Sequence, residues 1–178
     1  RRGIALLAQA GLVTPRADAR LLLAHAAGME PAGLATTAVL DEQVENRYRE
    51  LLVRRVAGEP VQYLTGRAYF RKISVEVGPG VFIPRPETEL VVQFALHRLI
   101  TMRAQTGPSP VVVDMGTGSG VIAASIVAEY PGTPVVHAVD VSAQALSWAR
   151  RKLAGTGLRV VEGRMGQALP ELDGLVDL

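Results

Sequence analysis

One apolar segment of the sequence leads directly into a glycine-rich turn. Residues 111–115 (VVVDM) precede residues 116–120 (GTGSG), and a helical pattern follows from about Ser119 to Glu129. Glycines let the backbone approach a ligand closely, and the first N–H groups of the following helix face the carboxyl end of the sheet, where open α/β folds bind ligands. We therefore expect a nucleotide-like ligand at this turn. The alternative is a tight connection that binds nothing.

A carboxylate stands at the end of the next predicted strand. Asp140 follows residues 135–139 and comes 24 positions after Gly116. Its two oxygens could accept hydrogen bonds from both hydroxyls of a ribose bound at this edge of the sheet. Asp140 could instead serve only as a cap before the helix predicted from Ser142. The glycine turn and the carboxylate together favour the binding interpretation.

The spacing of the glycines indicates which ligand class fits. The dinucleotide fingerprint is G-x-G-x-x-G, whereas this chain has G-x-G-x-G, and Val121 stands where that fingerprint needs Gly or Ala. NAD is therefore disfavoured. With Asp114 included, the pattern D-x-G-x-G-x-G is similar to the first motif of methyltransferases that use S-adenosylmethionine. That resemblance implies that Asp114 lies near the ammonium group of the ligand, directly or through water.

The elements around these residues predict an α/β fold. Apolar strands alternate with helices after about residue 110, which implies a doubly wound, mainly parallel sheet with helices on both faces. The predicted strands are 111–114, 135–139 and 158–162, with a fourth beginning at Val176, and the helices are about 119–129 and 142–153.

The first part of the chain has a different pattern. Residues 1–66 read as short helices, including one between Asp41 as N-cap and Gly58 as the stop. Alternating apolar residues at 73, 75 and 77 then indicate extended structure, and a helix follows from Glu87. We divide the chain into a helical domain at 1–66, a β-hairpin linker at 67–84 and part of the α/β domain at 85–178.

Composition excludes several classes of protein. The 178 residues are 48% hydrophobic and contain no cysteine, so we expect a packed core and neither disulfides nor thiolate metal sites. Three scattered histidines do not suggest a metal site, and a net charge of +2 does not demand nucleic acid. No apolar run is long enough to cross a bilayer, so we expect a cytoplasmic protein. The chain opens without Met, and its last residues look like the start of a strand, so we expect a piece of a longer protein.

Further segments narrow the family. Residues 80–89 (GVFIPRPETE), 59–66 (EPVQYLTG) and the run from Pro170 to Leu178 resemble the release-factor glutamine methyltransferase family along essentially the whole chain. The resemblance implies a small helical N-terminal domain that docks the substrate, a β-hairpin linker, and a Rossmann-like domain that uses S-adenosyl-L-methionine. That last domain would be truncated here after its third or fourth strand.

The resemblance also implies a set of cofactor-binding residues. Asp140 would hold the ribose, Met165 would pack on the adenine, and a segment before the α/β domain would close over the cofactor. The two prolines and nearby carboxylates of that segment also fit a structural role, in which they stiffen the chain where it enters a helix and complement the positive helix N-terminus. The implied residues are Asp114, Gly116, Thr117, Gly118, Ser119, Gly120, Asp140 and Met165, with Phe82, Arg85 and Pro86 in the closing segment.

Two positions depart from the family pattern. The family commonly has an acidic residue after the third strand, where this chain has Arg164, and a guanidinium cannot accept a hydrogen bond from the adenine amino group. The hairpin carries Arg71-Lys72 where the family often has a glycine, which leaves the turn type open.

The implied reaction is methylation of a glutamine side-chain amide. The methyl group would pass from S-adenosyl-L-methionine, leaving S-adenosyl-L-homocysteine, to the Gly-Gly-Gln loop of class 1 peptide chain release factors. The family holds the amide with an Asn-Pro-Pro-Tyr motif, which residues 1–178 lack and which we expect beyond Leu178. We therefore assign no catalytic residue and expect this chain alone to be inactive.

Two other functions compete with this one. One is a DNA adenine N6-methyltransferase, in which the same Asn-Pro-Pro-Tyr motif holds the amino group of a flipped base. Against it, residues 1–70 contain nine Arg and seven acidic residues, a small basic excess for a DNA-binding surface. The other alternative is a nicotinamide oxidoreductase, or a nucleotide-binding domain without catalysis. We expect release factors as partners, and no nucleic acid, membrane or metal.

Overall fold

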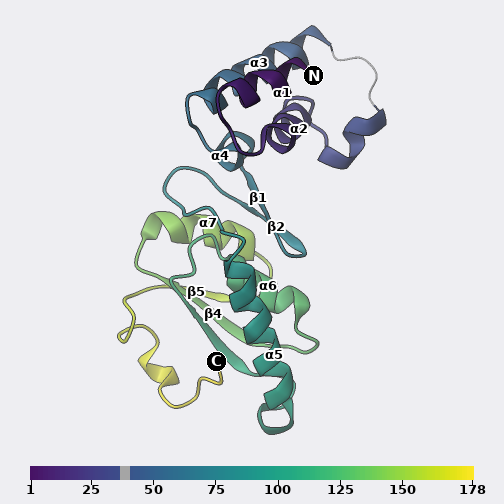
Figure 1. The fold of residues 1–178 in the computed structure, drawn as a ribbon. Coiled ribbons are helices and arrows are strands. Elements are labelled where there is room, and N and C mark those ends of the chain that lie inside the picture. The colour runs from purple at the N-terminus through teal and green to yellow at the C-terminus, as the bar shows by residue number, and fades with distance from the viewer. Residues whose placement is uncertain (37–40) are drawn as a thin grey trace. The chain divides into compact units, whose positions relative to one another are not determined.

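The computed structural model describes residues 1–36 and 41–178 (Figure 1). The chain divides into two compact units, Arg1–Gly66 and Arg67–Leu178, and the hairpin belongs to the second. Gly66 ends the last helix of the first unit in the left-handed conformation, with φ of +69°. Within residues 1–36 and 41–178, no helix has the length and apolar character needed to span a membrane.

The first unit is helical, as the sequence predicts. Asp41 caps α3, because its side chain accepts a hydrogen bond of 2.7 Å from the Val44 N–H, which confirms the predicted cap. Buried aliphatic side chains such as Leu7 and Leu22 form a core of its own. The elements are α1 (Arg2–Gln9), α2 (Pro15–Ala26), η1 (Pro31–Thr36), α3 (Glu42–Val56) and α4 (Val61–Thr65).

One buried ion pair joins two helices of this unit. Arg55 of α3 donates from Nε to Oδ2 of Asp18 in α2 at 2.8 Å, and Thr14 donates to the other carboxylate oxygen at 2.9 Å. Asp18 is only 3% exposed, so these hydrogen bonds take the place of the water contacts that its carboxylate loses on burial. The pair therefore fixes α3 against α2 in addition to their apolar packing.

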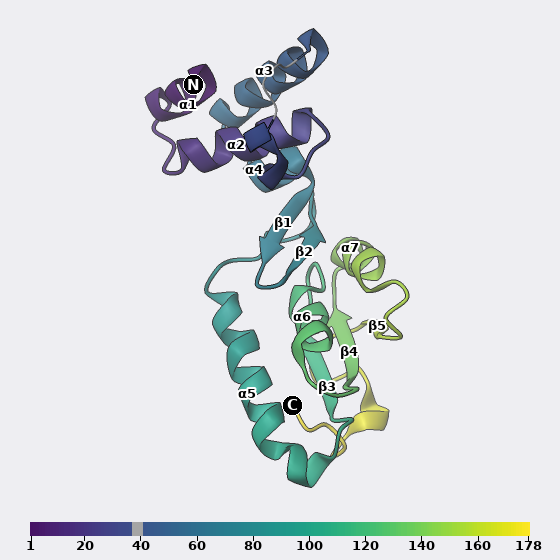
Figure 2. The same cartoon turned by 90° about the vertical axis from the view of Figure 1, so that its right-hand side faces the viewer.

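The second unit is an α/β structure (Figure 2). Its sheet is parallel with the order β3-β4-β5, which confirms the predicted alternation of strands and helices. A short antiparallel hairpin precedes it. The elements are β1 (Arg67–Phe70), β2 (Ile73–Glu76), α5 (Thr88–Thr106), β3 (Val111–Met115), α6 (Val121–Glu129), β4 (Val135–Asp140), α7 (Ala143–Leu153), β5 (Arg159–Glu162) and η2 (Pro170–Leu172).

The two faces of the sheet are covered differently. Asp114 and its neighbour Ala138 share the face toward α6, because Asp114 accepts a hydrogen bond from the N–H of Ala123 in that helix. Val113 and Met115 face the other way, toward a segment from Gly166 to Leu178 that contains η2. We expected helices on both faces. Among the described residues, this segment with its short 3-10 helix covers the second face in place of an α-helix.

The last residues pair with the free edge of β3. The N–H of Val113 donates to the carbonyl of Leu178 at 2.9 Å, and the N–H of Asp177 donates to the carbonyl of Val111 at 2.9 Å. The Asp177 carboxylate also accepts the N–H of Val111 at 2.8 Å. The predicted fourth strand is not formed as a strand, but its residues lie beside β3, where the doubly wound order places the next strand.

The hairpin turn is held by a largely buried arginine. Arg71 has φ of +48°, the left-handed conformation that disfavours most side chains, which settles the turn geometry that the sequence left open. Its guanidinium donates to both oxygens of Glu129 in α6, at 2.7 and 2.9 Å, and its N–H donates to Glu89 in α5. The side chains of Arg71 and Glu129 are only 15% and 5% exposed. Arg71 therefore fixes the hairpin to both α5 and α6.

Replacing the acid of this pair should destabilise the second unit. We expect Glu129→Gln to lower the free energy of unfolding by about 2 to 4 kcal/mol, because the buried guanidinium loses its anionic partner. Urea denaturation followed by circular dichroism measures this. Glu171→Gln is the control, because its pair with Arg159 is half exposed and should contribute little. Equal effects of the two substitutions would contradict the assignment.

The same comparison has a definite pH dependence. The hydrogen bonds from Arg71 lower the pKa of Glu129 below its ordinary value of 4.5. A lowered folded pKa means that the contribution is complete above about pH 4.5 and is lost as the pH falls through the folded pKa. The stability difference between the unsubstituted chain and Glu129→Gln should therefore shrink below that pH and stay constant near neutrality.

Candidate functional site

A cavity lies at the carboxyl ends of the three parallel strands. Its volume is about 430 Å³, within the range of small-molecule sites. It lies where open α/β sheets bind ligands, because three strand ends and the loops that follow them meet there. The lining residues are Met115, Gly116, Val139, Asp140, Val141, Gly163, Arg164, Met165 and Gln167.

The glycine turn is fixed to the neighbouring strand. The N–H groups of Gly116 and Thr117 both donate to the carbonyl of Val139, at 2.8 and 2.9 Å. Gly116 has φ of +80°, and an added Cβ there would meet no protein atom within 4 Å, so the space beside it is open to a ligand. Position 120 also favours glycine, because an added Cβ would lie 3.3 Å from Leu153 of α7.

Asp140 links the ends of all three strands. Its Oδ2 accepts the N–H of Gly118 at 2.9 Å, and its Oδ1 accepts the N–H of Ser142 at 2.9 Å. Its main-chain carbonyl accepts the N–H of Gly163, which follows β5, at 3.0 Å. The side chain therefore points toward the glycine turn and also caps the approach to α7. Each carboxylate oxygen has a further lone pair with which to accept a hydrogen bond from a ligand.

Asp114 braces the turn from the opposite side. Only 7% exposed, it accepts hydrogen bonds on Oδ2 from the Thr117 hydroxyl at 2.6 Å and from the Ala123 N–H at 3.2 Å. Burial raises the pKa of Asp114, and the nearby Asp140 raises it further, against the lowering effect of the two hydrogen bonds. Asp114 does not line the 430 Å³ cavity. Its predicted contact with a ligand ammonium group stays a prediction.

Two other residues of the turn have side chains that are buried in the protein. Thr117 and Ser119 are 4% and 2% exposed, so their side chains are enclosed by protein. Of the five turn residues, Gly116 alone lines the cavity. The sequence pattern located the turn correctly but could not show which of its members faces the open space.

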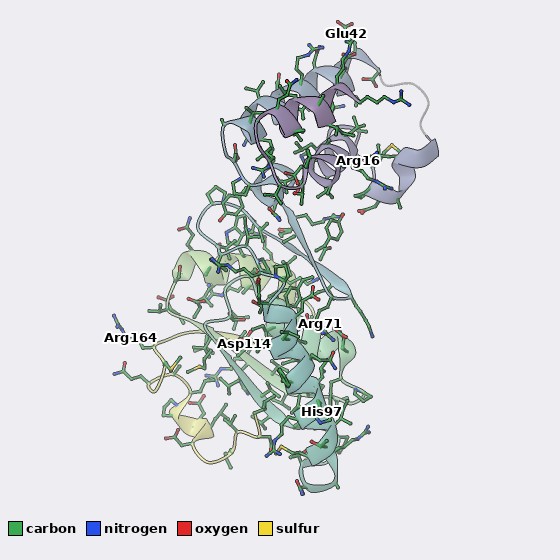
Figure 3. All side chains as sticks on the ribbon, viewed as in Figure 1. Arg16, Glu42, Arg71, His97, Asp114 and Arg164 are labelled. Atoms are coloured by element: carbon green, nitrogen blue, oxygen red, sulfur yellow. The ribbon has the colours of Figure 1, made fainter. Side chains whose placement is uncertain are left out.

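The segment after β5 forms the outer wall of the cavity. Met165 lines it and is 78% exposed, so its thioether is available for contact with a ligand, and its packing on adenine stays a prediction. Arg164 lines it too and lies at the edge of the unit, whereas Asp114 lies inside (Figure 3). Gln167 is a lining residue that the sequence analysis missed. Its position two residues after Met165 in the same loop is the signal that could have found it.

The predicted closing residues lie on the segment between β2 and α5. The Arg85 guanidinium stacks over the Phe82 ring, 5.0 Å from its centroid, and Phe82 is 63% exposed. Phe82, Arg85 and Pro86 do not line the 430 Å³ cavity. Closure of these residues over a cofactor therefore stays a prediction.

The histidines occupy three different settings. His25 and His97 are exposed on α2 and α5, whereas His137 is buried in β4. Burial, and to a lesser extent the nearby Arg159, lowers the pKa of His137. Among residues 1–36 and 41–178, no group of three or more His, Cys, Asp or Glu side chains is arranged to hold a metal ion.

Two family models match the chain. Residues 1–66 match the model described as the PrmC N-terminal domain, and residues 112–178 match a methyltransferase domain. The first match coincides with the helical unit, and the second begins in β3 and contains the glycine turn and the cavity.

Curated relatives extend along nearly the whole chain. A release factor glutamine methyltransferase from Streptomyces coelicolor is 46% identical over 97% of this chain and 59% of its own length. One from Bifidobacterium longum is 41% identical over 97% of this chain and 63% of its own length. A 4-amino-L-phenylalanine/4-methylamino-L-phenylalanine methyltransferase from Streptomyces pristinaespiralis is 39% identical over 92% and 55%. The chain thus spans about three-fifths of the length of the first two relatives.

The hydroxyl that braces Asp114 should contribute measurably to stability. We expect Thr117→Val, which keeps the shape of the side chain, to lower the free energy of unfolding by about 1 to 3 kcal/mol, because a buried carboxylate loses a hydrogen bond. Urea denaturation measures the change. Thr101→Val is the matched control, since the Thr101 hydroxyl bonds the Arg98 carbonyl on an exposed face of α5. A loss at position 101 as large as at position 117 would disprove the bracing role.

Proposed function

We propose that this chain, which is similar to release factor glutamine methyltransferases along nearly its whole length, carries the cofactor site of an enzyme that methylates the glutamine amide of the Gly-Gly-Gln loop in class 1 release factors. The donor would be S-adenosyl-L-methionine and the product S-adenosyl-L-homocysteine. The observation that supports the cofactor assignment most directly is the Asp140 carboxylate, which faces both the glycine turn and the cavity. The substrate assignment rests on the relatives.

The residues around the cavity fit the chemistry of this cofactor. Asp140 would accept hydrogen bonds from the ribose hydroxyls, and the missing side chain of Gly116 leaves room for the methionine part. Met165 would pack its thioether on the adenine ring. Bound there, the cofactor supplies an electrophilic methyl group on a positively charged sulfur.

Two polar side chains line the cavity close to Met165, where we place the adenine. Arg164 offers only hydrogen-bond donors, so it can serve the ring nitrogens of adenine but not the amino group. Gln167, on the same wall, carries an amide oxygen that can accept from that amino group. We therefore propose that Gln167 accepts the hydrogen bond from the adenine amino group.

The amide substrate makes a specific demand on the enzyme. The lone pair of an amide nitrogen is delocalised, so the nitrogen must be held in line with the methyl group while its N–H groups donate to fixed acceptors. Residues 1–178 contain no Asn-Pro-Pro-Tyr motif, and we assign this task to none of the described residues. We expect the chain to bind cofactor without turnover. The helical unit, with its own core, would contribute to docking the release factor.

A second substrate class has one observation in its favour. A relative 39% identical to this chain is a 4-amino-L-phenylalanine methyltransferase. The nitrogen of an aromatic amine, like that of an amide, is bonded to an sp² carbon and has a delocalised lone pair. A free aromatic amino acid therefore has to be tested beside the release factor, and so does duplex DNA, whose adenine amino group has the same property.

Calorimetry tests the cofactor assignment. We expect the chain to bind S-adenosyl-L-homocysteine and to show no binding of NADH, because the cavity has a ribose-binding carboxylate but lacks the dinucleotide glycine spacing. Asp140→Ala should weaken this binding by roughly 1 to 3 kcal/mol through the loss of charge-assisted hydrogen bonds.

Asp173→Ala serves as the control for the Asp140 substitution. Asp173 is exposed and lies outside the 430 Å³ cavity, so its removal should leave the affinity unchanged. Binding of NADH in place of S-adenosyl-L-homocysteine would reject the cofactor assignment. An Asp140→Ala variant with full affinity would show that the ribose is held elsewhere.

Methyl transfer tests the substrate. With the chain extended to the length of its relatives, tritium from labelled S-adenosyl-L-methionine should appear in a class 1 release factor and be absent when the glutamine of its Gly-Gly-Gln loop is replaced by alanine. Duplex DNA and 4-amino-L-phenylalanine are tested in parallel. Label in either of these, with none in the release factor, would reject the proposed substrate.

A further inference from the structure

We propose that one face of α7 positions the segment 77–87 and thereby sets where Phe82 and Arg85 stand relative to bound cofactor, an inference that rests on the proposed function. This face, which we call the α7 platform, consists of Gln144, Trp148 and Arg151. The three residues lie at positions i, i+4 and i+7 of the helix and therefore share one side. They are positioning residues and do not themselves line the cavity.

The first contact is between Gly78 and the Trp148 ring. A Cβ built on Gly78 would lie 2.6 Å from Cη2 and 2.7 Å from Cζ2 of the indole, closer than real Cβ contacts. The backbone of the segment therefore lies directly against the ring, and any side chain at position 78 would push the two apart. Trp148 is the single tryptophan of the chain.

The second contact lies one turn earlier on the helix. The Gln144 side-chain amide donates to the carbonyl of Pro79 at 3.4 Å. Gly80 has φ of +90°, and a Cβ there would collide with the Gln144 side chain. Buried valines on either side, Val77 and Val81, hold the turn at 1% and 3% exposure. The turn is therefore fixed at both ends and along its backbone.

The third contact connects the platform to the hairpin. The Arg151 guanidinium lies 4.1 Å from the centroid of the Trp148 ring and also pairs with Glu76 of β2 at 3.1 Å. Arg151 thus bridges the indole and the strand from which the segment departs. A cation over an aromatic face with an anion beside it favours one orientation of the ring.

The platform is only a short distance along the chain from the cavity. Gln144 comes three residues after Val141 and four after Asp140, both of which line the cavity. Phe82 directly follows the buried Val81, and Arg85 stacks on it. Pro84 and Pro86 stiffen the remaining path to α5. The α7 platform consequently sets the position of Phe82 and Arg85 relative to the cavity.

A glycine substitution separates positioning from simple packing. Gly78→Ala inserts a methyl group between segment and indole, and we expect it to weaken S-adenosyl-L-homocysteine binding about three- to tenfold, because the segment loses its preorganised position. Gly132→Ala is the matched control. Its Cβ would crowd the Pro108 carbonyl oxygen at 2.5 Å, but at the amino end of β4, away from the cavity. It should lower the melting temperature and leave the affinity unchanged.

Trp148 supplies a readout that packing alone would not move. Binding of S-adenosyl-L-homocysteine should change the tryptophan emission of the unsubstituted chain and of Gly132→Ala, because the segment against the indole engages the ligand. The change should be reduced in Gly78→Ala. Gln144→Ala, a milder change at an exposed residue, should weaken binding about two- to threefold. It keeps the test informative if Gly78→Ala fails to fold.

The outcomes separate the two levels of the proposal. A chain that binds no S-adenosyl-L-homocysteine rejects the proposed function itself. A chain that binds it with unchanged tryptophan emission, or whose Gln144→Ala and folded Gly78→Ala variants bind with full affinity, overturns the platform and leaves the cofactor assignment standing. Weaker binding by both variants, with the Gly132→Ala affinity intact, supports it.

Discussion

The cavity depends on the hydrogen bonds that Asp140 makes in three directions. One carboxylate oxygen holds the glycine turn, the other holds the entry to α7, and the carbonyl holds the segment after β5. The two bonds to the carboxylate are charge-assisted and therefore stronger than the neutral bond to the carbonyl, and together the three hold the loops in place before any ligand arrives. Because these loops are already ordered, less of the binding free energy of a ligand is lost in ordering them.

Buried charge is handled differently at the two sides of this unit. Arg71 and Glu129 are paired through two hydrogen bonds, so each compensates the desolvation of the other. Asp114 is satisfied instead by a hydroxyl and a backbone N–H, and burial raises its pKa. The first arrangement ties the hairpin to two helices, and the second stiffens the turn beside the cavity.

Local patterns predicted the elements well, because helix caps and strand alternation are properties of a few neighbouring residues. Asp41 caps its helix and Asp140 stands at a strand end as the sequence indicated. Features that join distant residues were not accessible in this way. The left-handed Arg71 depends on Glu129, 58 residues later, and the fit of Gly78 depends on Trp148. The cavity likewise admits Gln167 but excludes Asp114, because face and burial decide this and the motif does not.

The anchoring of the glycine turn has a consequence for the order in which the molecule assembles. The amides of Gly116 and Thr117 find their acceptor in Val139, and Gly118 finds its acceptor in Asp140, more than twenty residues further along the chain. The bonds that the turn makes close by in sequence, from the Thr117 hydroxyl to Asp114 and from the Gly120 N–H to the Thr117 carbonyl, leave these three amides without acceptors until β4 is in place. On a chain emerging from the ribosome, α6 can form early, whereas the ligand-ready conformation of the loop before it must wait for the second strand to dock.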